Sequence, residues 1–363
     1  MMNRLLFALL VFLALPVLAD HESAEKILGQ FNEYPSRTHK LKPAQTLRKL
    51  PISTDTASYG MKSDVEALGK DVFSVLIIEN GAVITENYAN GAAANTPLNL
   101  YSATKSLTAL AVGEALCAGK IKSLDDLAST YAPVLEGTAY GAASIRNLLG
   151  YTSGAKDPGG SGFSGIHNNG DFAAMMRQSM LLADLLKKHG EASPQYKAGE
   201  KFNYNGLNSE ALSLVVRGAT GAPLPQWFEA TVWQKAGAES AASWFTDRDD
   251  NGVAEALVWI TTRDFARIGL YVLERLTNKT ADSCMNAFVQ EAALPRIDKG
   301  SYWRLPAPSY GLGMHIGADK TVWFQGHGTQ VLAINQKTGR ILAINGFREW
   351  RGMATDVLRL FNR

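Results

Sequence analysis

The stretch NLYSATKSLTALAVGEAL, residues 99 to 116, changes character at Ser102. Polar, turn-forming residues precede Ser102, and a long apolar, alanine-rich run follows it, which predicts a helix from Ser102 to about Gly119. The N-terminus of a helix presents free N–H groups and a partial positive charge, and both stabilise a developing alkoxide or oxyanion. Because residues three apart share a helix face, Lys105 can reach the Ser102 hydroxyl. The two residues can therefore act as nucleophile and base.

The Ser-x-x-Lys pattern occurs three times, beginning at Ser23, Ser102 and Ser153. Ser23 precedes the expected core, and Ser153 leads into the loop-like sequence KDPGGSG, so only Ser102 opens a strong helix. To accept a proton near neutral pH, Lys105 needs a pKa well below about 10.4, and burial among apolar neighbours favours such a shift. The alternative is a serine that caps the helix, followed by a solvated lysine.

The composition is that of a globular protein. Of the 363 residues, 46% are hydrophobic and 19% are charged, which is enough for one large domain or two small ones. The formal net charge is +2, because 36 basic residues nearly balance 34 acidic ones, so the charge does not predict a nucleic-acid partner. The six histidines lack the spacing of a zinc site, and two cysteines cannot form a thiolate cage. We expect neither a metal nor another cofactor.

The first twenty residues, MMNRLLFALLVFLALPVLAD, have the pattern of a secretory signal peptide. A basic Arg4 precedes an apolar run from Leu5 to Leu15, and small residues end the pattern at Ala19. The alternative is a membrane anchor, but the apolar run is shorter than the roughly 20 residues that a spanning helix needs. We expect residues 1–19 to be cleaved and the mature protein to be periplasmic or secreted, without a stable membrane span.

The chain contains only two cysteines, Cys117 and Cys284. An exported protein could join them in a disulfide. Cys117 lies inside the apolar helical run, however, where a cysteine commonly acts as a small buried hydrophobe. We therefore expect no disulfide framework, and whether the two cysteines pair stays open.

The remaining sequence predicts strands at both ends and helices between them. Residues 20–60 are polar and contain three prolines, which indicates an N-terminal arm. Residues 71–89 are two apolar runs joined at Asn80-Gly81, a hairpin signal, and residues 321–347 are again strand-like. Helices are predicted at 144–150, 171–188, 207–218, 225–236, 262–276 and 351–362. Since short strands cannot stay unpaired, one antiparallel sheet from both chain ends is expected, packed against the helical middle.

A tyrosine precedes another predicted helix, in the sequence FNYNGLNSEALSLVV, residues 202–216. Tyr204 stands at the turn that enters this helix, where a phenol can relay a proton between lysine, serine and a leaving group. Taken alone, Tyr204 could equally be a core or capping residue.

Together these stretches resemble the serine β-lactamase and penicillin-binding-protein superfamily, within it the class C-like branch of esterases and 6-aminohexanoate-dimer hydrolases. The resemblance implies an α/β (α+β) fold of β-lactamase/transpeptidase type, with a five-stranded antiparallel sheet, flanking helices and a mostly helical insert at about 120–300, over residues 61–363. It implies Ser102 as the acylated nucleophile, Lys105 as general base and Tyr204 as proton shuttle. The matching stretches are YSATKSLTALAVG (101–113), SIRNLLGYTSG (144–154), FNYNGLNSEALSLVV (202–216), TTRDFARIGLYVL (261–273), YGLGMHI (310–316) and GHGTQ (326–330).

The third motif of the superfamily, K-T-G or H-x-G, supplies a backbone oxyanion donor. A literal Lys337-Thr338-Gly339 is present, but it lies between two apolar runs and is predicted to be a hairpin turn. GHGTQ is the better match, and in that register the His327 amide joins the Ser102 amide as oxyanion donor. The other register, His327-Gly328-Thr329 as H-x-G, gives that role to Thr329.

Two departures from the superfamily affect the expected substrate. Class C β-lactamases carry Tyr-x-Asn, whereas Gly206 stands two residues after Tyr204 here. A cleft lysine at the third motif is also missing, which leaves less positive charge to hold a penicillin carboxylate. We expect a serine hydrolase for a small-molecule ester or amide. The alternatives are a D-alanyl-D-alanine carboxypeptidase or β-lactamase, and a catalytically idle binding module.

Overall fold

The computed structural model describes residues 37–54, 72–158, 170–299, 306–347, 358–359 and 361. Its larger sheet has eight antiparallel strands in the spatial order β3-β2-β12-β11-β10-β9-β8-β7. The strands are β2 (Val72–Glu79), β3 (Ala82–Tyr88), β7 (Ile297–Asp298), β8 (Ser309–Tyr310), β9 (His315–Ile316), β10 (Val322–Gly326), β11 (Gln330–Asn335) and β12 (Arg340–Gly346).

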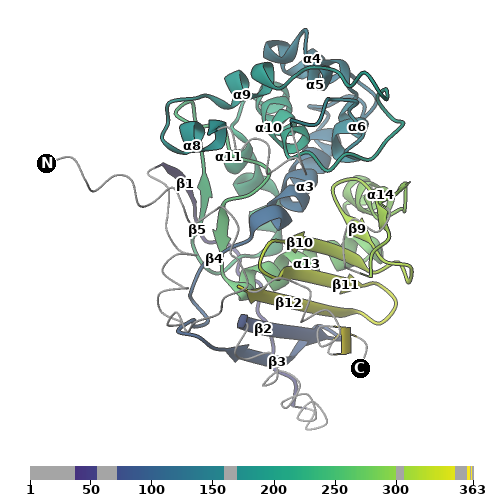
Figure 1. The fold of residues 1–363 in the computed structure, drawn as a ribbon. Helices are drawn as coiled ribbons and strands as arrows, with labels where there is room; N and C mark the ends of the chain where they lie inside the picture. Colours follow the sequence, from purple (N-terminus) through teal and green to yellow (C-terminus); the bar gives the residue numbers. More distant parts are fainter. Residues whose placement is uncertain are drawn as a thin grey trace, which may run out of the picture.

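Both chain ends contribute to this sheet, as the sequence predicts. Strand β2 from the N-terminal half pairs with β12 from the C-terminal end (Figure 1). The predicted turn joins β2 to β3 through Asn80 and Gly81, which both have positive φ, as a two-residue type I′ hairpin requires. The five strands from β3 to β10 correspond to the predicted five. The sheet then continues with β9, β8 and β7, which have two residues each and which the sequence did not predict.

Both faces of the sheet are covered. Along β2, Leu76 and Ile78 point into the main core, whereas Val75 and Ile77 belong to a second cluster on the opposite face. Helix α13 (Thr262–Leu276) packs on the main-core face, on β2, β11 and β12. Its first turn is capped by the Thr261 hydroxyl, which accepts the Asp264 N–H. The predicted helix 262–276 is confirmed.

Helix α3 (Thr104–Cys117) runs between the large sheet and the mostly helical part of the molecule (Figure 1). A smaller antiparallel sheet, in the order β1-β5-β6-β4, flanks it. The helices are α4 (Ala128–Tyr131), α5 (Ala139–Ala142), α6 (Ile145–Leu149), α8 (Asp171–Met176), α9 (Leu182–Lys188), α10 (Leu207–Thr220), α11 (Leu224–Phe228) and α12 (Gln234–Ala236); the small strands are β1 (Thr38–Leu41), β4 (Leu98–Asn99), β5 (Ala242–Phe245) and β6 (Val258–Ile260).

Several predicted elements differ in detail. The predicted helix 171–188 is divided into α8 and α9 by a turn in which Gln178 has a φ of 61°. The predicted helix 225–236 contains a π-helical turn, Glu229–Trp233, between α11 and α12. Within the predicted arm, residues 38–41 form β1 and pair with β5, so this part of the arm belongs to a sheet. In the part of the chain that the structure describes, no helix is long and apolar enough to cross a membrane.

Some predictions fall on residues outside the described ranges. These are the signal peptide at 1–19, residues 20–36 of the arm, and most of the closing helix at 351–362, of which 358, 359 and 361 are helical.

The expectation about the cysteines is wrong, because Cys117 and Cys284 form a disulfide with a Cα–Cα distance of 5.7 Å. Cys117 ends α3, and Cys284 lies in the first turn of α14 (Ser283–Ala292), which packs on α3. One turn before Cys117, a Cβ on Gly113 would meet the Phe288 ring at 2.3 Å. This close approach of the two helices brings the cysteines together, although the apolar pattern around Cys117 suggests ordinary burial.

Candidate active site

Ser102 lies in a single 3₁₀ turn, η2 (Tyr101–Ala103), that leads directly into α3. The preceding residue, Tyr101, has a φ of 46°, an uncommon conformation for a non-glycine residue. Its N–H donates a 2.9 Å hydrogen bond to the Asn99 side-chain oxygen, which holds the turn in place. Neither η2 nor α3 has a side-chain cap at its N-terminus, so the alternative of a capping serine at 102 is excluded.

Lys105 is buried, with an exposed fraction of 3%, and faces Ser102. Its Nζ donates a 2.9 Å hydrogen bond to Ser102 Oγ and a 2.8 Å hydrogen bond to the carbonyl oxygen of Glu255. Burial lowers the pKa of Lys105, while the carboxyl groups of Glu255 and Glu210 act in the opposite direction. The alternative of a solvated lysine is therefore also excluded.

The segment that receives Lys105 is fixed by hydrogen bonds from two helices. The Glu210 carboxyl on α10 accepts the N–H groups of Ala254 and Glu255 at 2.9 and 3.1 Å. The Thr108 hydroxyl on α3 donates to the Ala254 carbonyl at 3.2 Å. These contacts hold the Glu255 carbonyl where Lys105 can donate to it. Burial raises the pKa of Glu210, and the nearby Glu255 carboxyl raises it further.

Tyr204 lies three residues before the N-terminal end of α10, and its ring faces Lys105. Lys105 Nζ lies 5.2 Å from the centroid of the Tyr204 ring. The ring stacks on Tyr151 with a centroid distance of 5.0 Å. Tyr310 closes the group edge-on against Tyr151, at 5.3 Å. The structure thus brings together three predicted site residues, Ser102 in η2, Lys105 in α3 and Tyr204 in the segment before α10.

Next to Tyr204 lies a buried pair, Lys299 and His315, that the sequence did not predict. Lys299 Nζ is 2.9 Å from His315 Nδ1, and the His315 ring centroid is 6.0 Å from that of Tyr204. Burial lowers the pKa of Lys299 to about 8. Burial, together with the charges of Lys299 and Lys105, keeps the pKa of His315 well below its ordinary value. His315 lies in the quoted stretch YGLGMHI, but nothing in the local pattern indicates a role for it.

The GHGTQ stretch ends β10 beside the serine turn. A Cβ on Gly326 would lie 2.0 Å from the Leu100 carbonyl oxygen, so only glycine permits this approach. His327 is exposed, and its ring meets the Tyr101 ring edge-on at 5.7 Å. Thr329 is buried in the same hairpin turn, with a φ of 68°. Both residues proposed for the oxyanion donor therefore lie in the turn next to η2.

The competing motifs lie elsewhere. Lys337 and Thr338 are exposed in the turn between β11 and β12, and the Asn335 side chain accepts both of their N–H groups. This confirms the predicted hairpin turn at Lys337-Thr338-Gly339. It lies at the opposite end of β11 from the His327 turn, about 17 Å away at 3.3 Å per residue. Lys156 of the third Ser-x-x-Lys pattern pairs with Glu191 at the surface, at 2.8 Å.

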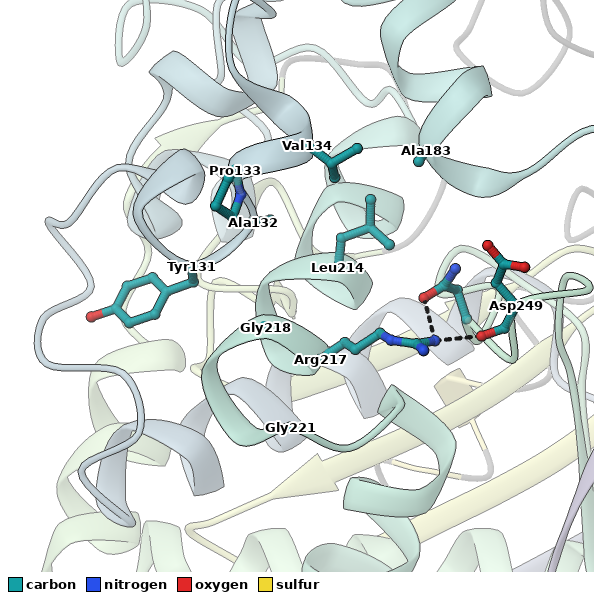
Figure 2. Close-up of a pocket in the computed structure, with 11 residues that line it drawn as sticks. Tyr131, Ala132, Pro133, Val134, Ala183, Leu214, Arg217, Gly218, Gly221 and Asp249 are labelled. Carbon is teal, nitrogen blue, oxygen red and sulfur yellow. Dashed lines mark hydrogen bonds between the residues drawn. The ribbon is translucent and has the colours of Figure 1, made fainter.

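A surface groove of about 580 Å³ lies away from these residues (Figure 2). It is formed at the C-terminal end of α10, where the Arg217 guanidinium donates to the Asp249 carbonyl and the Asn251 side chain. Since α10 has 14 residues, this end is about 20 Å from the end next to Tyr204. Among the described residues, no group of three or more histidine, cysteine or acidic side chains could hold a metal ion.

Comparisons with known proteins agree with this fold. The sequence model of the beta-lactamase family matches residues 62–356. The 6-aminohexanoate-dimer hydrolase of Paenarthrobacter ureafaciens is 25% identical over 255 residues, which cover 66% of this chain and 60% of that protein. The chain thus spans about 60% of the length of this curated relative.

Three solved structures have the same fold. A protein assigned as a 6-aminohexanoate-dimer hydrolase from Bacillus anthracis has a TM-score of 0.77 at 18% identity, covering 93% of this chain and 92% of that one. EstCE1, a hydrolase with promiscuous acyltransferase activity, has a TM-score of 0.68 at 19% identity, covering 85% and 98%. A penicillin-binding protein from Bacillus halodurans has a TM-score of 0.63 at 18% identity, covering 83% and 99%.

These findings identify the family and the fold of the chain. The chain belongs to the beta-lactamase family and has the β-lactamase/transpeptidase-like fold that the resemblance implied. Solved structures with a similar fold include EstCE1, a hydrolase with promiscuous acyltransferase activity, and a D-stereospecific amidohydrolase from Streptomyces.

Proposed function

We propose that the protein is an exported serine hydrolase that cleaves an ester or amide bond through an acyl-enzyme on Ser102. The observation that supports this most directly is the 2.9 Å hydrogen bond from the buried Lys105 Nζ to Ser102 Oγ. A nucleophile within hydrogen-bond reach of a base whose pKa is lowered by burial is the arrangement that covalent catalysis requires.

In the acylation step, Ser102 Oγ attacks the carbonyl carbon of the substrate, and the hydroxyl proton passes to Lys105 Nζ. The C–O or C–N bond of the substrate then breaks, and the leaving alcohol or amine takes a proton from Lys105 by way of the Tyr204 phenol. In deacylation, water attacks the acyl carbonyl, a water proton passes back through the same groups, and Ser102 regains its hydroxyl proton. Water is the only co-reactant.

The tetrahedral intermediates need donors for their negative oxygen. We assign this role to the backbone N–H groups of Ser102 and His327, with Thr329 as the alternative to His327. The close packing of Gly326 on the Leu100 carbonyl supports this assignment, because it brings the end of β10 to the serine turn.

The proposed substrate is a small-molecule ester or a linear amide. The curated relative is named for an amide of this kind, a 6-aminohexanoate dimer, and one structural neighbour is an acyltransferring hydrolase. Gly206 provides no side-chain amide beside the site, and Lys337 lies on a remote turn. Both features favour such substrates over penicillins and D-alanyl-D-alanine peptides.

Export is part of the proposal and has two supports. Residues 1–19 have the pattern of a signal peptide, and a disulfide such as Cys117–Cys284 persists in oxidising compartments. If the full chain is expressed in a bacterium with a periplasm, we expect the purified protein to begin at Asp20. Recovery of the uncleaved chain would contradict export.

The mature protein and its Ser102→Ala variant test the hydrolase assignment. Each would be given a short-chain acyl ester and penicillin, with ester turnover and intact mass as readouts. We expect ester turnover to fall at least about 10³-fold in Ser102→Ala, with stability changed by about 1 kcal/mol or less. The matched control is Ser153→Ala, which alters the serine of another Ser-x-x-Lys pattern and should retain turnover. Substantial turnover by Ser102→Ala would refute the nucleophile assignment, and a lasting Ser102-dependent penicillin adduct would favour a penicillin-binding enzyme.

A further inference from the structure

The Glu255 carboxyl fills the volume that any side chain at position 206 would occupy, beside the candidate active site. Gly206 is the last residue before α10 and stands two residues after Tyr204. A Cβ built on Gly206 would lie 1.6 Å from Glu255 Oε2 and 2.6 Å from its Cδ. The space that a side chain at position 206 would enter is therefore filled by a carboxyl group from a segment about 50 residues further along the chain.

Glu255 contacts the lysine in two ways. Its carbonyl oxygen accepts a 2.8 Å hydrogen bond from Lys105 Nζ, and its Oε2 lies 3.9 Å from the same nitrogen. The side chain is 2% exposed. Among the described residues, Oε2 has no hydrogen-bond partner. A buried carboxyl oxygen without a hydrogen bond, 3.9 Å from an ammonium nitrogen, interacts with that nitrogen through its charge.

Glu255 and Lys105 shift each other's pKa. Burial raises the pKa of the Glu255 carboxyl, and Lys105 acts against that shift. Conversely, the negative charge of Glu255 favours the protonated form of Lys105. The other titratable groups that interact with these two side chains come from several elements and are Glu210, Tyr140, Tyr151, Tyr204 and His315.

We propose that Glu255 is a positioning residue for Lys105: its carboxyl occupies the volume of a residue-206 side chain and controls how readily Lys105 gives up its proton. This inference rests on the proposed function, in which Lys105 must be neutral to accept the Ser102 proton. Position 206 must then be glycine, because any Cβ there would collide with the carboxyl at position 255.

The first experiment is the pH profile of kcat/KM for a short-chain acyl ester in Glu255→Gln. The amide has nearly the same shape but no charge, so Lys105 loses its proton more easily. We expect the rising limb of the profile to move to lower pH by about one unit or more. The matched control is Glu114→Gln, a buried glutamate near the other end of α3, which should leave the limb in place. A profile that is lower but unshifted in Glu255→Gln would overturn the proposal, because a purely structural role predicts that result.

The second experiment tests the shared volume with a double-mutant cycle. Gly206→Ala alone should lower activity at least tenfold, because its new methyl group collides with the Glu255 carboxyl. In a Glu255→Ala background, where the carboxyl is removed, the same change should cost less than twofold. Equal losses in both backgrounds would overturn the proposed competition for space.

Failure of this inference can be told apart from failure of the proposed function. If Ser102→Ala is inactive and Glu255→Gln leaves the limb unshifted, only the role of Glu255 is refuted. If Ser102→Ala retains turnover, the acyl-enzyme proposal fails, and the role of Glu255 fails with it.

Discussion

The two ends of α3 each bury a charged side chain but compensate it differently. Near the N-terminal end, Lys105 donates to a hydroxyl and a carbonyl oxygen, and the Glu255 carboxyl stays 3.9 Å away. Near the C-terminal end, Glu114 is 4% exposed and fully engaged. Lys235 Nζ donates to both of its oxygens, at 2.8 and 2.6 Å, and the Tyr271 hydroxyl donates at 2.6 Å.

This difference separates a charge with a structural role, Glu114, from the charge that we propose to be reactive, Lys105. A buried charge with close counter-charges and complete hydrogen bonds anchors the helix. A buried ammonium whose nearest carboxylate stands beyond hydrogen-bond distance loses its proton more readily than one in direct contact with a carboxylate, and a general base must lose its proton. The disulfide at Cys117 further fixes the C-terminal end of α3. One helix thus carries a rigid end and an end that holds the proposed nucleophile and base.

The largest effect on turnover is expected for Lys105→Met. Methionine fills a similar volume without a basic nitrogen, so we expect ester turnover to fall at least about 10³-fold while the protein stays folded. In the unchanged protein, kcat/KM should rise with pH as Lys105 loses its proton, at a pH below the ordinary lysine pKa of about 10.4. The variant should lack this rising limb. A pH–rate profile and circular dichroism would measure both, and turnover within tenfold of the unchanged protein would remove Lys105 from the mechanism.

A weaker effect is expected at the other end of the helix. Glu114→Gln removes the charge that Lys235 and Tyr271 contact, so the free energy of unfolding should fall by about 1–3 kcal/mol. Turnover of the folded variant should stay within twofold, because Glu114 lies more than two helical turns from Lys105. Denaturant unfolding and ester kinetics would measure the two effects. Unchanged stability would mean that the contacts of Glu114 contribute nothing to anchoring α3.

Local patterns were sufficient to predict the N-terminal end of α3 and several elements around it. The change of character at Ser102, the Asn80-Gly81 turn and the helix 262–276 depend on neighbouring residues, and the structure has all three. A family resemblance added Tyr204 and the turn at His327, which lie close to Ser102 in space but far from it in sequence.

What the sequence could not provide are contacts made by packing. Glu255 stands 150 positions after Lys105 in a segment with no regular pattern, and hydrogen bonds to Glu210 and Thr108 hold that segment at the site. The Cys117–Cys284 disulfide spans 167 positions and depends on α14 lying against Gly113. Neither contact has a local signal, so local pattern predicted a buried thiol and no acid beside Lys105.

The smallest expected effect concerns a third kind of lysine, one that is solvated. Lys337 belongs to a literal K-T-G, yet it is exposed in a turn at the end of β11 remote from His327. Because this turn lies about 17 Å from the His327 turn, the Lys337 ammonium cannot contact the reacting atoms. Lys337→Ala should therefore change kcat/KM less than twofold, with Lys156→Ala, another surface lysine, as the matched control. A loss of several hundredfold confined to Lys337→Ala would mean that sequence motif outweighs burial in deciding which lysine is reactive.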